Sequence, residues 1–386
     1  HVRSRRQRQM CIRDSKYTDT FGKVQFVYAW KLVPTDKTPA GKRDDISLRE
    51  KEKEIRKDLD DGIDTIGKKM TVCELYAKQN RHRGNVRHNT TKGRERLMKL
   101  LEADKLGSCP IDSVKLSDAK EWALRMKEKG ISYKTISNDK RSLKAAFYTA
   151  IQDDCIRKNP FDFQLNTVIE DDTEPKVPLT AEQEESLLSF MQGDSVYQKY
   201  RDEVIILLGT GLRVSELCGL TETDLDFENR IINVDHQLLR SAETGYYIEK
   251  PKTESGIRQI PMSEKVYEAL GRVLENRKGS KPITIDGYSN FLFLNRDGCP
   301  KTATSYDNMF RGLAKKYNKC HEEALPKVMT PHTLRHTFCT NLANAGMNPK
   351  ALQYIMGHSN ITMTLNYYAH ATFASAKAEM ERLIAA

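Results

Sequence analysis

A chain of 386 residues is longer than one hydrophobic core usually serves, so two or three domains are expected. Charged residues make up 30% of the chain and the net charge is +10, which favours an anionic partner, nucleic acid before a membrane surface. No apolar run approaches the ~20 residues that cross a bilayer, and no secretory signal is found. The eight cysteines include no Cys-x-x-Cys pair, which argues against a disulfide framework or a zinc knuckle and favours a reducing cytoplasm.

The first fifteen residues differ from the rest of the chain. They carry five arginines against one aspartate and show no apolar period. We interpret residues 1–15 as a non-native assembly scar and leave them out of the fold prediction. Removing their charge of +4 from the net charge of +10 leaves +6, so the rest of the chain is still basic.

Residues 16–66 predict a small sheet with one helix. Lys16 and Tyr17 could end a first strand. An alternation of apolar side chains indicates a second, half-buried strand: Val24, Phe26, Tyr28, Trp30 and Leu32. Ser47 and Glu50 have the spacing of a capping box, which predicts a helix that begins there.

Residues 67–165 predict a helical domain. Apolar residues recur at helical spacing in four stretches: 70–77, 91–101, 117–129 and 133–154. Between Lys78 and Lys99 the chain carries eight Lys or Arg against one Glu. Such a run is more often a solvated face than a binding site, but in a DNA-binding chain phosphate contacts are the favoured interpretation. The candidate DNA-binding residues are Lys78, Arg81, Arg83, Arg87, Lys92, Arg94, Arg96 and Lys99.

Residues 166–178 are polar, acidic and proline-bearing, which indicates a linker. The domain beyond it, residues 179–386, mixes helices with strands. Helices are expected at 180–191, around 204–208, at 263–276, around 309–317, from 331, at 349–356 and in a tail at 373–383. Strands are expected at 230–234, 246–248 and 259–261.

The stretch from 330 to 370 carries the chemistry. It holds His332, Arg335 and His336, then His358 in a Met-Gly-His turn, then two adjacent tyrosines. A tyrosine hydroxyl has a reference pKa of ~10 and attacks poorly until a base takes its proton. A phosphate under attack needs its charge balanced, which the fixed fork of arginine donors does well. The pattern therefore indicates attack of a tyrosine on a phosphodiester.

The succession His-Thr-Leu-Arg-His, Met-Gly-His and Tyr-Ala-His resembles the catalytic signature of the tyrosine recombinases. Within them the chain is most similar to the integrases of conjugative transposons, from about Lys16 to the C-terminus. The resemblance implies a mainly α multidomain fold. Its parts would be a sheet-plus-helix arm-type DNA-binding domain, an all-α core-binding domain and an α+β catalytic domain.

The resemblance further implies six catalytic residues and one supporting carboxylate: Arg213, Lys252, His332, Arg335, His358 and Tyr368, with Glu216. The two arginines would clamp oxygens of the phosphate, and the glutamate would orient the first arginine. The first histidine would accept the tyrosine proton, and the second would donate a hydrogen bond to a phosphate oxygen. The lysine would protonate the departing 5′ oxygen.

Two of these choices have neighbours as alternatives. Tyr367 adjoins Tyr368, and adjacency alone cannot separate a nucleophile from a packed aromatic ring. Lys250 competes with Lys252, which the family placement before a threonine favours. The remaining histidines, including His236, are interpreted as structural.

The implied reaction needs no cofactor and no metal. A metal site at His332, His336 and Cys339 has helical spacing, but no glutamate follows the first histidine as a zincin requires. The implied partner is double-stranded DNA, namely element ends and target, bound by a homotetramer. An accessory DNA-bending or excision protein is a further candidate partner, and no membrane is involved. The implied location is the bacterial cytoplasm, at the nucleoid.

The predicted function is site-specific recombination that excises and integrates a mobile element through a 3′-phosphotyrosine intermediate and a Holliday junction. A type IB topoisomerase would share the chemistry but reseal the same strand. A non-catalytic DNA-binding regulator would need no nucleophile. The tail from Phe373, with apolar residues at helical spacing, is expected to exchange between protomers.

Overall fold

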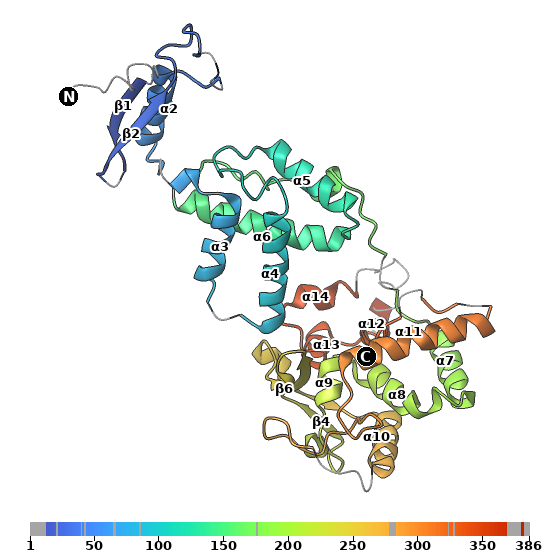
Figure 1. Ribbon diagram of the computed structural model, residues 1–386. Coiled ribbons are helices and arrows are strands. Elements are labelled where there is room, and N and C mark those ends of the chain that lie inside the picture. Colours follow the sequence, from blue (N-terminus) through green and yellow to red (C-terminus); the bar gives the residue numbers. More distant parts are fainter. Residues whose placement is uncertain are drawn as a thin grey trace. The chain divides into compact units, whose positions relative to one another are not determined.

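The computed structural model describes residues 13–368, apart from 21, 40, 42–43, 65–66, 85, 175–176, 278–282, 323 and 327–328, together with residues 380–381. The chain forms two compact units, His1–Glu174 and Pro175–Ala386, whose boundary falls within the segment expected to be a linker (Figure 1). In the described part, no helix is both long and apolar enough to span a membrane.

The first unit begins with an antiparallel pair of strands, β1 (Arg13–Thr18) and β2 (Val24–Ala29), with helix α2 (Leu48–Asp60) packed on them. The expected capping box is confirmed, since Ser47 accepts from the Glu50 amide and Glu50 accepts from the Ser47 amide. Leaving residues 1–15 out of the fold was wrong in part, because β1 begins at Arg13; residues 1–12 lie outside the described residues.

The predicted burial of β2 is corrected. Val24, Phe26 and Tyr28, the alternating apolar side chains, are 57%, 58% and 56% exposed, whereas Ala29 on the opposite face is 4% exposed. An alternating pattern shows that one face is apolar, but it does not show which face a helix covers. Here α2 packs on the other face of the sheet, and among the described residues the face with Val24, Phe26 and Tyr28 stays exposed.

The rest of the first unit is helical, as expected from the sequence. It contains the short helix η1 (Gly67–Lys69), then α3 (Val72–His82), α4 (His88–Glu102), α5 (Leu116–Glu128), α6 (Tyr133–Gln152) and η2 (Leu165–Thr167). Trp122 and Phe147 are fully buried, and both rings pack against Phe161, with ring centroids 5.7 and 5.4 Å away. These aromatic contacts join the helices around one core.

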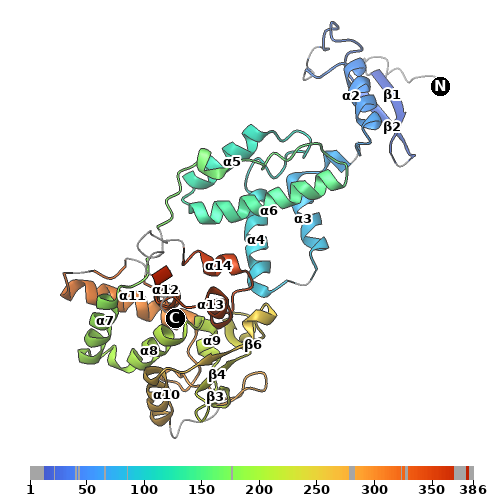
Figure 2. The same ribbon diagram turned by 180° about the vertical axis from the view of Figure 1, so that it is seen from behind.

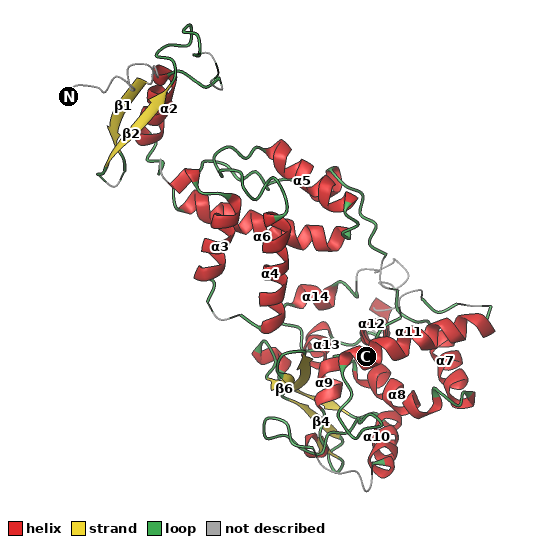
Figure 3. Cartoon of the chain, in the orientation of Figure 1, coloured by secondary structure: helices red, strands yellow, loops and turns green. Residues whose placement is uncertain are grey.

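Helices dominate the second unit (Figures 2 and 3). They are α7 (Ala181–Gly193), η3 (Gln198–Tyr200), α8 (Arg201–Thr210), α9 (Val214–Gly219), η4 (Glu222–Asp224), η5 (Glu254–Gly256), α10 (Glu264–Asn276), α11 (Ala303–Cys320), α12 (Pro331–Asn344), α13 (Pro349–Met356) and α14 (Ile361–Leu365). Helix α8 packs against both α10 and α12. The mainly α fold class is thereby confirmed.

The strands of the second unit form two separate sheets. Strands β3 (Leu225–Asp226), β4 (Ile231–Val234) and β7 (Arg258–Pro261) make an antiparallel sheet, and β5 (Gln237–Ser241) pairs with β6 (Gly245–Glu249). The segment 250–257, which contains Lys250 and Lys252, connects β6 to β7 and so joins the two sheets.

The elements β3, β5 and α14 were not expected from the sequence. The expected helical tail at 373–383 lies outside the described residues, except for residues 380–381.

Candidate active site

The turn after α8 places the first candidate arginine. Gly211 ends that helix with φ +62°, a left-handed conformation that glycine adopts without strain. A Cβ there would lie 2.3 Å from the Phe338 side chain, so the chain passes close to α12. Arg213 follows two residues later as the N-cap of α9, where Glu216 accepts from its backbone amide at 2.9 Å.

The C-terminal end of α13 gathers three arginine side chains. The carbonyl groups of residues 355–357 each accept a hydrogen bond from a different arginine. Arg258 Nε donates to the first at 2.6 Å, Arg335 Nη2 to the second, and Arg213 Nη2 to the third at 2.9 Å. Because the last carbonyls of a helix lack intrahelical partners and carry partial negative charge, cationic donors are stabilised there.

Glu216 lies beneath these arginines and is 3% exposed. Its Oε1 accepts from Arg213 Nη1 at 2.6 Å, and its Oε2 accepts from Arg258 Nη2 at 2.8 Å. Burial by itself would raise the pKa of Glu216, but the hydrogen bonds and charge of Arg258, with the charge of Arg213, lower it to about 2. The carboxylate is therefore ionised at neutral pH and holds both guanidinium groups.

Arg335 comes from α12 and is 4% exposed. Its Nη1 donates to the Gly211 carbonyl at 2.6 Å. Burial, and then the like charge of Arg213, lower the pKa of Arg335 to about 9, which still leaves it cationic at neutral pH.

The cluster carries excess positive charge. Three arginines, at 213, 258 and 335, face one carboxylate at 216, which leaves +2 (3 − 1 = 2). The Arg213 side chain is 37% exposed, so it offers part of this charge to solvent. Such a site favours an anion, and phosphate in particular matches the arginine fork.

His358 lies directly after the α13 turn and is buried. Burial, followed by the charge of Arg335, lowers the pKa of His358 to about 4, so the ring is neutral at neutral pH. Its Nδ1 is 2.9 Å from the Thr364 hydroxyl, which is fully buried on α14. A hydroxyl that donates to Nδ1 leaves the ring proton on Nε2, from which it can be donated to a phosphate oxygen.

Replacing Thr364 with valine tests this tautomer. Valine keeps the shape but removes the hydroxyl, so the ring proton loses its fixed place and cleavage is expected to slow about 10- to 100-fold. The measurement is the rate of adduct formation on a nicked duplex. Thr362→Val, at an exposed position of the same helix, is the matched control. Equal rates for the two variants would show that Thr364 does not set the tautomer.

His332 lies at the surface, and so does the turn of residues 250–256 that contains Lys250 and Lys252 (the lysine turn). His332 is exposed on α12, and its charge contributes to the lowered pKa of His358. Lys252 is exposed in the turn between β6 and β7, and Lys250 is exposed as well, so the choice between them stays a prediction. The turn is compact, because a Cβ on Gly256 would lie 2.4 Å from the Pro251 ring.

The two tyrosines occupy different surroundings. The Tyr367 ring lies 4.9 Å from the His336 ring and 6.5 Å from the His358 ring, whereas the Tyr368 hydroxyl donates to the Met347 carbonyl in the turn before α13. Burial raises the pKa of both hydroxyls. The structure therefore brings Arg213, Glu216, Arg335 and His358 together, but directs Tyr368 to a backbone carbonyl.

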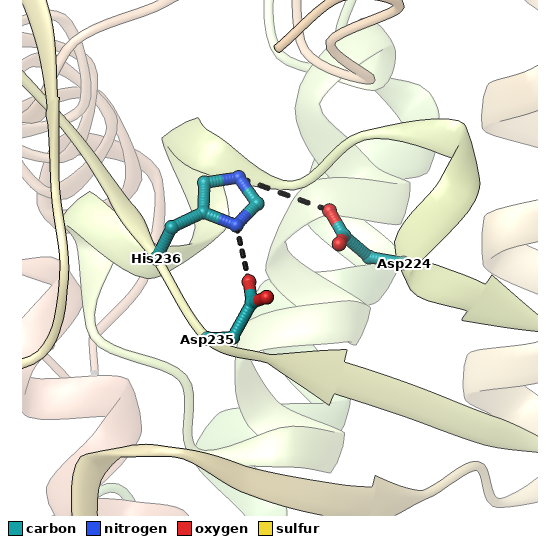
Figure 4. Close-up of side chains that lie close together, drawn as sticks. All are labelled: Asp224, Asp235 and His236. Carbon is teal, nitrogen blue, oxygen red and sulfur yellow. Dashed lines mark hydrogen bonds and ion pairs between the residues drawn. The ribbon is translucent and has the colours of Figure 1, made fainter. Parts of the chain in front are cut away.

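A second cluster, around His236, has the composition of a metal site (Figure 4). Its Nδ1 lies 2.6 Å from an Asp235 oxygen and its Nε2 lies 2.7 Å from the Gly219 carbonyl. The third member, Asp224, accepts from the Thr221 amide and hydroxyl at 2.7 Å each. Because both ring nitrogens face oxygen acceptors, the geometry is that of a hydrogen-bonded core histidine, in line with the structural interpretation of His236.

Ion pairs within the unit involve members of the candidate DNA-binding run. Lys78 lies 2.8 Å from Asp153, and Arg96 pairs with the buried Asp139. Four others are exposed: Arg81, Arg83, Lys92 and Lys99. Arg87 and Arg94 are half-buried. The exposed members of the run present their charge at the surface, where a polyanion could reach it, while Lys78 and Arg96 also take part in ion pairs within the unit.

The salt dependence of DNA binding tests this run. Changing Arg81, Arg83 and Arg87 together to glutamine is expected to flatten the log–log slope of affinity against salt by ~0.9 for each phosphate that the protein no longer neutralises. Binding is measured by titration at several salt concentrations. The control changes three exposed lysines outside the run: Lys105, Lys129 and Lys134. If both triple variants show the same slope of affinity against salt, the three arginines contact no phosphate and the run is a solvated surface.

Sequence reasoning missed Arg258 and Thr364. A signal for Arg258 exists, since Arg258 and Ile260 share one face of β7 and both are buried. An arginine in register with buried apolar residues on a strand indicates a buried ion pair. Thr364 carried no such signal, because its importance depends on a histidine from outside its helix.

A mainly helical fold with an arginine cluster near two tyrosines is the arrangement expected of a tyrosine recombinase. The chain belongs to the phage integrase family, whose sequence model matches residues 178–375. A second model, described as the DNA binding domain of tn916 integrase, matches residues 6–59 and so begins inside the segment left out as non-native. The resemblance to tyrosine recombinases and conjugative-transposon integrases is thereby confirmed.

Individual relatives agree with this family. The chain is 67% identical over 368 residues to the transposase from transposon Tn916 of Enterococcus faecalis, covering 95% of this chain and 91% of the relative. A solved structure of the Tn1549 transposon integrase with a circular intermediate DNA is 77% identical, has a TM-score of 0.78, and covers 81% of this chain and 99% of that chain. The lambda integrase dimer on a core site, 15% identical with a TM-score of 0.55, shares the fold over 85% of this chain and 82% of that chain.

Proposed function

We propose that this protein is a site-specific DNA recombinase that excises and integrates a transposon. The observation that carries the proposal is the cluster of Arg213, Glu216 and Arg335 at the end of α13, with His358 beside it and an excess of positive charge. The 67% identity to the Tn916 transposase supports the same function. The Tn1549 integrase solved with DNA supports DNA as the partner.

The proposed reaction is a transesterification. Arg213 and Arg335 bind the scissile phosphate, and the neutral His358 donates to one of its oxygens. The Tyr368 oxygen attacks phosphorus while His332 takes its proton, forming a 3′-phosphotyrosine bond. The bond from phosphorus to the 5′ oxygen breaks, and Lys252 protonates that oxygen.

Resealing runs the same steps in reverse. A 5′ hydroxyl from another strand attacks the phosphotyrosine and frees the tyrosine. Two such exchanges pass through a Holliday junction and join two duplexes. Phosphate ester bonds are exchanged one for one, so the reaction needs no nucleotide, redox or metal cofactor.

The resting position of Tyr368 adds a requirement. Its hydroxyl donates to the Met347 carbonyl, so this hydrogen bond must break before the oxygen can reach a phosphate. We infer that binding of DNA and of neighbouring protomers in a tetramer supplies this change. Tyr367, which lies beside His358, is the alternative nucleophile on the strength of that contact.

DNA contacts are proposed at two places in the first unit. The exposed face of β2, with Val24, Phe26 and Tyr28, would enter a groove of arm-type DNA, as a two-stranded ribbon can. The exposed members of the basic run between 78 and 99 would contact phosphates at the core site. An accessory DNA-bending or excision protein would act on the same DNA.

A nicked suicide duplex carrying an element end tests the proposal. A recombinase forms a covalent protein–DNA adduct on it and then joins the cut strand to a second duplex. A topoisomerase of the type IB class forms the adduct but reseals the original strand. A DNA-binding regulator forms no adduct, and that result would overturn the proposal.

A further inference from the structure

One buried arginine has no part in the proposed chemistry. Arg258 begins β7, and its side chain is 0% exposed. Four hydrogen bonds use its donors: Nε to the Ile355 carbonyl at 2.6 Å, Nη1 to the Gly256 carbonyl at 3.0 Å, Nη1 to Glu216 Oε1 at 3.1 Å and Nη2 to Glu216 Oε2 at 2.8 Å. A guanidinium this deeply buried is stable in the fold because its donors are bonded and its charge is paired.

The partners of Arg258 belong to three segments that each carry a candidate catalytic group. Glu216, 42 residues away in the chain, holds the Arg213 guanidinium. Gly256 closes the turn that presents Lys252. Ile355, 97 residues away, lies in the last turn of α13 before His358. One planar side chain therefore joins the arginine, lysine and histidine segments of the candidate site.

Packing around Arg258 leaves little freedom. A Cβ on Gly357 would lie 3.1 Å from Arg258 Nη1 and 3.0 Å from the Ser255 carbonyl. The lysine turn and the end of α13 thus approach each other directly over this guanidinium. Lysine could keep one charge at the position, but it lacks the planar fork that bonds three partners at fixed angles.

We propose that Arg258 is a positioning residue that aligns Arg213, through Glu216, and Lys252, through the Gly256 turn, for the cleavage step. This inference rests on the proposed function. Arg258 itself does not touch the phosphate, because its side chain has no exposed surface. Its contribution to cleavage is the geometry of the groups that do.

The experiment uses the full chain with Arg258→Lys and Arg258→Gln. Adduct formation is measured on two nicked duplexes that differ at one atom, with either oxygen or sulfur as the bridging 5′ atom at the cut. A thiol has a reference pKa of ~8.5 and leaves without a proton donor, so the sulfur duplex bypasses the lysine. The variant Lys252→Met lacks the proton donor altogether, so its rates on the two duplexes show how much of a lysine defect the sulfur atom restores. Arg272→Gln, which removes an exposed pair with Asp202, is the matched control.

Arg258→Lys is expected to cleave the oxygen duplex about 10²-fold more slowly than the unaltered chain, with DNA affinity unchanged. On the sulfur duplex, the cleavage rate of Arg258→Lys is expected to be at least about tenfold closer to that of the unaltered chain. The reason is that part of the loss on the oxygen duplex comes from a displaced lysine, which the sulfur duplex does not need. Rates are compared at a temperature where circular dichroism shows each variant folded. If Arg258→Gln does not fold, the lysine variant carries the test alone.

Two results would overturn the inference. Cleavage of both duplexes at the unaltered rate would show that Arg258 aligns nothing. An equal loss on both duplexes would overturn the inference as stated, because Lys252 would then be unaffected and Arg258 would not align the two groups together. Absence of adducts with the unaltered chain would instead refute the proposed function, so the two failures are distinguishable.

Discussion

Phenylalanine in place of Tyr368 is expected to abolish covalent protein–DNA adducts while DNA binding persists. The ring keeps its packing against the small cluster that includes Cys339 and Leu352, but the attacking oxygen is gone. Without the hydrogen bond to the Met347 carbonyl, the free energy of unfolding should fall by only about 1 kcal/mol. Adducts are measured on the nicked duplex by denaturing gel, and binding by titration.

Tyr367→Phe is the matched control for this prediction. It removes the neighbouring hydroxyl and retains the ring that lies beside His336 and His358. This variant is expected to form adducts, because the family placement assigns the attack to Tyr368. The reverse result, adducts with Tyr368→Phe and none with Tyr367→Phe, would identify Tyr367 as the nucleophile.

Lysine in place of Arg213 is expected to slow cleavage by about 10²- to 10³-fold, with a modest loss of DNA affinity. A lysine keeps the charge, but it cannot bond Glu216, the Gly357 carbonyl and a phosphate oxygen at once. The measurement is the rate of adduct formation at saturating protein, where differences in DNA affinity do not affect the rate.

Arg272→Lys makes the same exchange at an exposed ion pair and should leave the rate unchanged. Cleavage by Arg213→Lys as fast as by this control would remove Arg213 from the site. A normal rate of cleavage with weakened binding would instead place Arg213 among general phosphate contacts.

Local signals in the sequence were reliable. The capping box at Ser47 begins a helix in the structure, and the helix expected from 180 likewise begins with a capping box, because each bond joins residues three apart in the chain. Pro331 opens α12, which carries His332 and Arg335, and Gly357 ends α13 in the left-handed conformation. The integrase family was likewise predictable, since its motifs are short and contiguous.

Signals that depend on distant partners failed or were absent. The alternation in β2 identified an apolar face, but α2 packs on the other one. The strands around Lys252 were predicted, but not that they pair in different sheets. Arg258 escaped notice because its importance comes from Glu216 and Ile355, which are 42 and 97 residues away.

The sequence by itself determined the helices, their caps, the basic balance and the motifs that identify an integrase, because these rest on contacts between near neighbours or on composition. The tertiary structure alone decided how the candidate site is assembled. Carbonyls 355–357 each receive a different arginine, from β7, α12 and the start of α9. It also decided that the Tyr368 hydroxyl rests on Met347. Such bonds form only when packing brings distant segments together, and no local pattern encodes their partners.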